Sequence, residues 1–253
     1  MTTLFISDLH LSAERPDISG LFISFLQTQA RHADALYILG DLFEYWIGDD
    51  DLNDFHCLIE SELKALTTAG VPCFFMHGNR DFLVGDDFAQ RTGITILPEP
   101  TTVEIYGQRV VLLHGDTLCT DDVAYQRFRR VIRNPWLLSV ARRLPLTWRR
   151  SIATKLRDSS SGNSAEQQPL TPEQLDLYDA KSPAIENLLA VTETDLMIHG
   201  HTHRPGVHAH FVKGVEKTRI VLGDWYEQGS ILEFNSSDFE LKSQSLHRTA
   251  VEA

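Results

Sequence analysis

The sequence predicts an α/β fold built on a parallel β-sheet with helices on its faces. Short apolar runs alternate with longer amphipathic segments over the first hundred residues, which is the pattern of a βαβαβ unit. The apolar runs contain few polar residues, as strands buried on both faces do. The chain has 253 residues, of which 42% are hydrophobic. It can therefore bury the core of one large domain, or of one domain with an insertion.

The elements of the first half follow in regular order. Strands are expected at 3–7, 35–39 and 72–76, and helices at 19–32, 54–69 and 83–92. Residues 102–106 and 109–113 flank Gly107-Gln108 and are expected to form a β-hairpin.

The second half begins with a helical segment. Two or three helices are expected between 121 and 157, because Asn134-Pro135 and Pro145 interrupt the pattern there. The polar, low-complexity stretch 158–169 predicts a mobile loop. Thr171 and Pro172 have the residue types of a helix start. Further strands are expected at 195–198, 206–212, 218–222 and 230–234. Residues 1–120 and 191–253 would then form the core, and 121–190 an inserted cap.

Composition and charge exclude several classes of protein. The net charge of −12 argues against general nucleic-acid binding. Three cysteines are too few and too widely spaced for a disulfide framework or a zinc ribbon. Residues 2–8 lack the basic region of a signal peptide, and no apolar run reaches the roughly 20 residues that span a bilayer. We expect a cytoplasmic protein that is soluble or, at most, bound to a membrane surface.

The basic residues are concentrated in one segment. Ten cations lie between positions 127 and 157, with no Asp or Glu among them. They are Arg127, Arg129, Arg130, Arg133, Arg142, Arg143, Arg149, Arg150, Lys155 and Arg157. Such a concentration in an acidic chain indicates a separate role for this segment.

Five short clusters of metal-ligand residues are spread along the chain, and four of them follow an apolar run. They are Asp8-Leu9-His10, Gly40-Asp41, Gly78-Asn79-Arg80-Asp81, His114-Gly115-Asp116 and Gly200-His201-Thr202-His203. Taken singly, most could be ordinary turns or helix caps. Because parallel strands end at the same edge of a sheet, the five together predict one pocket for two divalent metal ions at that edge. Two such ions suit the hydrolysis of a phosphate ester.

In this order the clusters resemble the calcineurin-like metallophosphoesterase family, whose signature runs Asp-x-His, Gly-Asp, Gly-Asn-x-Asp, Gly-His, Gly-His-x-His. The one departure is His114, which Gly115 follows rather than precedes. The resemblance implies a four-layer α-β-β-α sandwich with an inserted helical cap, and two Mn²⁺ ions per chain. One ion would be held by Asp8, His10, Asp41 and His203, and the other by Asp41, Asn79, His114 and His201. Core or supporting roles are expected for His77, Asp116 and His199.

The residue after the motif asparagine distinguishes this chain within the family. Most members have a histidine there, thought to protonate the leaving group, whereas this chain has Arg80. A guanidinium does not release its proton near neutral pH, but it can hold a phosphate through two parallel contacts. Arg80 therefore favours a substrate whose leaving group needs no proton, such as a pyrophosphate.

Longer motifs resemble the branch of the family that hydrolyses the pyrophosphate of UDP-2,3-diacylglucosamine to UMP and 2,3-diacylglucosamine 1-phosphate in lipid A synthesis. These motifs are 79–83, 114–122, 126–129, 133–135, 198–205 and 221–225. The resemblance implies catalytic roles for Asn79, Arg80 and His201. Substrate contacts would fall on these three residues, on Asp122 and on a polar residue of the loop near Ser160. Ser159, Ser160, Ser161 and Asn163 are all candidates for that loop contact. The chain departs from this branch at 158–180, where the branch has lysines and this chain has none.

The basic segment suits an acylated substrate. Residues 136–144 and 146–150 combine Trp and Leu with arginine pairs, which is typical of helices at an anionic lipid surface. An ordinary solvated helix pair is the alternative. The resemblance implies an acylated UDP-sugar as substrate and a peripheral location on the cytoplasmic face of the inner membrane, with no obligate protein partner. Two other interpretations remain open: action on another nucleotide-sugar or a cyclic nucleotide, and a binding scaffold without activity.

Overall fold

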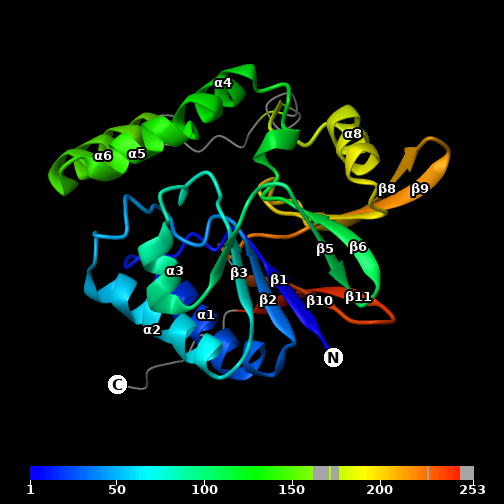
Figure 1. The fold of residues 1–253 in the computed structure, drawn as a ribbon, viewed down its shortest axis with the longest axis horizontal. Helices are drawn as coiled ribbons and strands as arrows, with labels where there is room; N and C mark the ends of the chain where they lie inside the picture. The colour runs from blue at the N-terminus through cyan, green and yellow to red at the C-terminus, as the bar shows by residue number, and fades with distance from the viewer. Residues whose placement is uncertain (162–170, 172–176, 227, 246–253) are drawn as a thin grey trace.

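The computed structural model describes residues 1–161, 171, 177–226 and 228–245, and it contains two β-sheets (Figure 1). The first sheet has six strands in the order β11-β10-β1-β2-β3-β4. Strands β1 to β4 run parallel, and β10 and β11 extend the sheet in antiparallel fashion. Their bounds are β1 Thr3–Ile6, β2 Ala35–Leu39, β3 Cys73–Met76, β4 Thr95–Leu97, β10 Gln228–Phe234 and β11 Phe239–Ser245.

The second sheet has five strands in the order β5-β6-β7-β9-β8. Strands β6, β7 and β9 run parallel, while β5 and β8 are antiparallel edge strands. The predicted hairpin at 102–113 is confirmed as β5 and β6. The bounds are β5 Thr101–Ile105, β6 Gln108–Leu112, β7 Leu196–His199, β8 Gly206–Val212 and β9 Val215–Val221.

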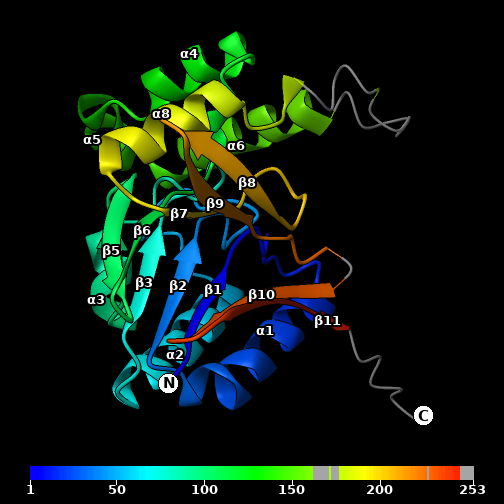
Figure 2. The same cartoon turned by 90° about the vertical axis from the view of Figure 1, so that its right-hand side faces the viewer.

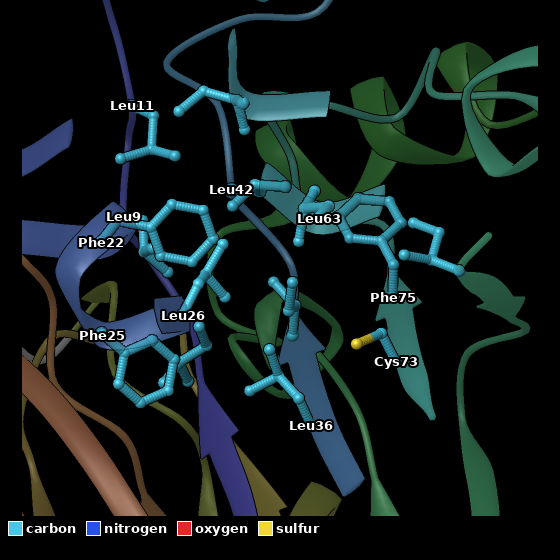
Figure 3. Close-up of a cluster of buried hydrophobic side chains, with 14 of the residues drawn as sticks. Leu9, Leu11, Phe22, Phe25, Leu26, Leu36, Leu42, Leu63, Cys73 and Phe75 are labelled. Carbon is cyan, nitrogen blue, oxygen red and sulfur yellow. The ribbon is translucent and has the colours of Figure 1, made fainter. Parts of the chain in front are cut away.

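Helices cover the outer face of the first sheet. They are α1 (Pro16–Thr28), α2 (Asp54–Thr68) and α3 (Asp86–Thr92). Figure 3 shows Phe22 and Phe25 of α1 and Leu63 of α2 in one cluster with Leu36 and Phe75 of the sheet. All of these side chains are buried. The helices and the sheet thus enclose one apolar core.

The opposite face of the first sheet packs on the second sheet. Successive side chains of a strand point to opposite faces, so Leu4 and Ile6 join the helical core, whereas Phe5 joins the other one. That second core also contains Met197 of β7 and Ile185 of α8 (Ser182–Thr192). Helix α8 lies against β8 on the far side (Figure 2). The layers follow the predicted α-β-β-α order.

Three helices lie above the carboxyl ends of β1, β2 and β3 (Figures 1 and 2). They are α4 (Val123–Ile132), α5 (Pro135–Arg143) and α6 (Leu146–Ser161). Asp122 caps α4, because its carboxylate accepts the backbone N–H of Tyr125. The side chain of Asn134 caps α5, and Pro135 occupies the first turn of that helix. The predicted interruption at Asn134-Pro135 is therefore the start of helix α5.

Arginines attach these three helices to the core. Arg149 is buried and forms an ion pair with Asp50, and it also donates to the carbonyls of Ile47 and Leu144. Arg129 binds Glu99 and Asp116, Arg150 binds Asp51, and Arg133 and Arg142 donate to backbone carbonyls of the core. Half of the ten cations of this segment thus face the protein itself. The prediction that the charge of this segment faces a lipid surface therefore does not hold for these five arginines.

Some boundaries differ from the predicted ones. Helix α1 begins three residues early because Pro16 suits its first turn, and residues 30–32 form a separate 3₁₀ turn. Residues 158–161 continue α6 instead of starting a loop, since the first Gly or Pro after Pro145 is Gly162. The rest of the predicted loop, 162–169, and the predicted helix start at Pro172 lie outside the described residues. Strands β4 and β11 and helix α8 were not predicted.

Among the described residues, no helix is both long and apolar enough to cross a membrane.

Replacing Arg149 with Met should loosen helices α5 and α6. The substitution keeps the apolar stem but leaves the carbonyls of Ile47 and Leu144 without their donor. We expect a loss of about 1–3 kcal/mol in the free energy of unfolding and faster amide exchange in α6. Urea denaturation and hydrogen exchange measure these changes. Arg143→Met is the matched control, because Arg143 is exposed and forms no ion pair within the described part of the chain. Equal stability of the two variants would contradict the attachment.

Candidate metal centre

The seven predicted metal ligands lie together at one place in the fold. Each belongs to the loop that follows a strand: Asp8 and His10 after β1, Asp41 after β2, Asn79 after β3, His114 after β6, and His201 and His203 after β7. Strands β1, β2 and β3 belong to the first sheet, whereas β6 and β7 belong to the second. The prediction of a single sheet edge was therefore wrong. The site lies where the carboxyl edges of two sheets meet.

The backbone of these loops is strained. Five of the seven residues have a positive φ between 49° and 68°, which only a few per cent of non-glycine residues adopt. They are Asp8, His10, Asp41, His201 and His203. Each such residue costs on the order of 1–3 kcal/mol, and strain of this kind concentrates at functional sites. With this backbone conformation, side chains from separate loops point toward one another.

Two glycines allow the loops to approach each other. A Cβ atom on Gly78 would lie 2.1 Å from Asp41 Oδ1, and one on Gly200 would lie 2.2 Å from Asp8 Oδ2. Both distances are far below van der Waals contact. Close packing around the two carboxylates thus requires glycine at positions 78 and 200.

Two overlapping groups of ligand atoms have the spacing of metal sites. The atoms of Asp8, His10 and His203 lie within 4.8 Å of one another, and so do those of Asp8, Asp41 and His114. Asp41 belongs to the second group, and its Oδ2 lies 3.8 Å from His10 Nε2 of the first group and 3.9 Å from His114 Nε2 of its own. This is the position expected of a bridging carboxylate.

Asn79 joins the second group together with His201. Its Oδ1 atom lies 3.0 Å from His114 Nε2 and 3.2 Å from His201 Nδ1. The backbone N–H of His201 donates to Asp8 Oδ2 at 2.8 Å, which connects the two groups through the main chain. An amide oxygen and two imidazole nitrogens therefore converge on one point.

Oxygen atoms behind two of the imidazoles set the orientation of the rings. His114 Nδ1 lies 2.9 Å from the carbonyl of Leu39, and His203 Nδ1 lies 3.0 Å from Asp224 Oδ2. In the neutral ring a proton on Nδ1 satisfies these oxygens and leaves the lone pair of Nε2 directed at the carboxylates. Metal-binding histidines are typically held in this way.

Buried negative charge dominates the electrostatics of the centre. Burial opposes ionisation of Asp8, but the imidazoles of His203 and His114 hold its pKa well below the usual range. Burial also opposes protonation of His114 and His203. The carboxylates nevertheless raise the pKa of His114 to about 9 and that of His203 to about 10. Burial and the neighbouring His114 lower the pKa of His201 to about 4. The centre therefore favours positive charge.

The buried atoms without partners fit a metal ion. Asp8 Oδ1 and both ring nitrogens of His10 have no hydrogen-bond partner within the described residues. Unpaired buried polar atoms are costly. A cation at this point would satisfy Asp8 Oδ1 and the ring nitrogen of His10 that faces the carboxylates, Nε2. Carboxylate, amide and imidazole together form the donor set of a transition-metal site.

Asp81, the last residue of its cluster, supports the loops from outside the ligand groups. Its carboxylate accepts the backbone N–H of Leu42 at 2.7 Å and of Gly78 at 2.8 Å. Burial and the charge of Asp41 raise the pKa of Asp81 to about 7. It thereby joins the loop after β2 to the loop after β3.

The three residues predicted to be non-ligands have other contacts. Ring nitrogens of His77 and His199 lie 2.8 Å from backbone carbonyls, and burial lowers their pKa values to about 4 and about 3. Asp116 accepts the hydroxyl of Tyr125 and the guanidinium of Arg129. It thus connects the loop of His114 to helix α4.

The predicted substrate contacts are only partly described. Arg80 stands beside the centre, where its backbone N–H donates to Asp41 Oδ1 at 2.8 Å. Asp122 lies at the start of α4, and Oδ1 of its carboxylate caps that helix. The side chain of Ser160 and the whole of Asn163 lie outside the described residues.

Several residues at the centre were not predicted. Tyr226 stacks on His10 with ring centroids 5.2 Å apart, and Tyr125 stacks on His201 at 6.2 Å. Asp224 holds His203. Its motif Gly223-Asp224 follows strand β9 as Gly40-Asp41 follows β2, so a sequence signal existed for Asp224. The two tyrosines have no such local signal.

Known proteins resemble the chain over nearly its whole length. Residues 1–205 match the family model of the calcineurin-like phosphoesterases. A UDP-2,3-diacylglucosamine hydrolase of Vibrio parahaemolyticus is 49% identical, over 96% of this chain and 98% of its own. The enzymes of that name from Aeromonas hydrophila and Escherichia coli O7:K1 are each 47% identical, over 97% and 95% of this chain and 100% and 98% of theirs. The chain therefore belongs to the calcineurin-like phosphoesterase family.

Proposed function

We propose that the protein is a metal-dependent hydrolase of lipid A biosynthesis, which splits UDP-2,3-diacylglucosamine into UMP and 2,3-diacylglucosamine 1-phosphate. The convergence of seven ligand side chains from five strand ends carries this proposal. The near full-length similarity to hydrolases named for this substrate supports its specificity.

The centre is proposed to hold two Mn²⁺ ions. Asp8, His10, Asp41 and His203 would bind one ion, and Asp41, Asn79, His114 and His201 the other. The mixed donor set suits Mn²⁺, Fe²⁺ or Zn²⁺ better than Ca²⁺. When bound, ions of this kind polarise a phosphoryl oxygen and make water a better nucleophile.

Arg80 is proposed to bind the pyrophosphate and to stabilise the leaving phosphate. Water attacks the phosphorus next to uridine and releases a proton to solvent, and the bond to the bridging oxygen breaks. The sugar 1-phosphate leaves as a stable anion, so no side chain needs to donate a proton to it. A guanidinium keeps its charge throughout and can donate two parallel hydrogen bonds to phosphate oxygens. Asn79 and His201, which meet at 3.2 Å, would position the attacked phosphoryl group beside it.

An exposed apolar surface on the cap favours an acylated substrate over a soluble nucleotide. Helices α4 to α6 expose Phe128, Val131, Trp136, Trp148 and Ile152, and Trp136 and Trp148 are 72% and 64% exposed. Arg127, Arg130 and Arg143 are exposed on the same helices. Large exposed apolar side chains next to cations suit an anionic lipid surface. We propose a peripheral location on the cytoplasmic face of the inner membrane.

Removal of a ligand should abolish the reaction. Purified protein is incubated with UDP-2,3-diacylglucosamine, with and without Mn²⁺, and UMP is followed by mass spectrometry. We expect Asp41→Ala and His114→Ala to lose activity by at least about 1,000-fold, because each removes support for charge in the transition state. The control is His208→Ala, which removes an exposed imidazole on β8. Metal-dependent UMP release by Asp41→Ala at the wild-type rate would defeat the ligand assignment.

Metal binding should release protons. Without metal, the raised pKa values keep His114 and His203 protonated at pH 7, whereas a ligating imidazole is neutral. Mn²⁺ affinity should therefore rise as pH increases from about 6 to 9. Calorimetry in buffers of different ionisation enthalpy counts the released protons. A binding heat that is the same in all buffers would contradict the predicted proton release.

The cap should contribute binding only for acylated substrate. Changing both Trp136 and Trp148 to Ser should lower kcat/KM for the acylated substrate by at least about tenfold, since each buried Trp contributes roughly 1.5–3 kcal/mol. It should also reduce sedimentation with phosphatidylglycerol vesicles. Val191→Ser on α8 is the control, because Val191 is equally exposed, at 70%, but lies outside the cap. Unchanged binding and kinetics in the double variant would favour a soluble substrate instead.

A further inference from the structure

Glu44 lies between the metal centre and Arg80. It follows β2 by five residues, and its backbone N–H donates to the carbonyl of Leu11 at 3.0 Å. Leu11 in turn donates to the carbonyl of Leu42 at 2.9 Å. The loop after β2 is therefore paired with the loop after β1, which carries His10. This pairing fixes the position of the Glu44 side chain beside the centre.

The carboxylate of Glu44 faces two functional side chains at once. Oε2 lies 3.4 Å from His10 Nδ1, and Oε1 accepts from Arg80 Nη1, also at 3.4 Å. The Glu44 side chain is 26% exposed, whereas that of His10 is only 4% exposed. One oxygen thus points to a predicted metal ligand, and the other to the predicted phosphate-binding group.

His10 needs an acceptor on the side away from the metal. Neither of its ring nitrogens has a hydrogen-bond partner within the described residues. Nε2 faces Asp41, and Nδ1 faces Glu44. His114 and His203 show the same arrangement, with an oxygen of Leu39 or Asp224 behind Nδ1. A decrease of a few tenths of an ångström would bring Glu44 and Nδ1 to hydrogen-bond distance.

Tyr226 and Glu44 restrict the ring of His10 in different directions. Tyr226 stacks on the ring with an interplanar angle of 6° and so defines its plane. Glu44 approaches Nδ1 at the ring edge and so defines the rotation of the ring within that plane. Together they direct Nε2 at Asp41.

We infer that Glu44 is a positioning residue that holds His10 for metal binding and Arg80 for phosphate binding. The part that concerns Arg80 rests on the proposed function. An arginine side chain has about 2 kcal/mol of rotamer entropy to lose on binding. An ion pair made before substrate arrives reduces this loss. Glu44 thereby couples the metal-ligand loop to the residue that replaces the usual histidine acid of the family.

Two readouts test the two contacts separately. Mn²⁺ binding to the purified chain, followed by the electron paramagnetic resonance of free Mn²⁺, tests the contact with His10. Glu44→Gln should weaken the affinity of one site by about tenfold, as loss of an orienting partner typically does. Glu44→Asp keeps the charge and should recover part of this loss. Glu14→Gln removes a nearby exposed carboxylate and should have no effect.

Steady-state kinetics at saturating Mn²⁺ tests the contact with Arg80. Glu44→Gln should raise KM for UDP-2,3-diacylglucosamine by about fivefold to tenfold, and the same change in an Arg80→Ala background should raise it no further. Equal, additive effects in the two backgrounds would overturn the coupling to Arg80. Wild-type Mn²⁺ affinity in Glu44→Gln would overturn the role toward His10. The metal readout needs no substrate, so it stands even if wild-type protein fails to hydrolyse this substrate.

Discussion

Buried negative charge at the junction of two sheets is the constraint on which the rest of the site depends. Asp8 and Asp41 are almost fully buried, and an ionised carboxylate without compensation is very costly there. Protonated His114 and His203 compensate this charge in the protein alone, as their raised pKa values indicate. A divalent cation would compensate this charge and would also satisfy Asp8 Oδ1 and Nε2 of His10. The strained loops and close glycine contacts serve to bring these groups together.

Charge compensation also holds the cap, helices α4 to α6, on the core. Its arginines neutralise carboxylates at the rim of the core, such as Asp50, Asp51 and Glu99. Arg129 also binds Asp116, which lies in the loop of His114. The cap is thus attached through groups that lead directly to the metal centre. Leu138 and Ala141 pack against the core, whereas Trp136 and Trp148 remain exposed and under the proposed function are available to acyl chains or a membrane surface.

In the proposed reaction the site acts without a general acid, and Arg80 stands where that acid would be. The guanidinium retains its proton, so it contributes charge and geometry to the reaction. A pyrophosphate suits such a site because its leaving group is already a weak base. Glu44 and the backbone contact with Asp41 hold Arg80 close to the predicted metal ligands. The proposed phosphate-binding residue and the predicted metal ligands are therefore in direct contact.

Local patterns in the sequence indicated the candidate ligands and most of the strands. An apolar run followed by Gly-Asp or His-x-His is contained within a few residues, so it can be recognised without the fold. The caps of α4 and α5, at Asp122 and Asn134, are local in the same sense. The short edge strand β4 lacked a comparable signal.

Only the tertiary structure decided which side chains support the ligands. Asp224 contacts His203 from about 20 residues away along the chain. Tyr226 contacts His10 from more than 200 residues away. The division of the ligands between two sheets was likewise hidden, because strand pairing joins segments that are distant in sequence. The ion-pair partners of the arginines in the basic segment were hidden for the same reason. A run of arginines has no visible partner until folding brings the acidic rim of the core beside it.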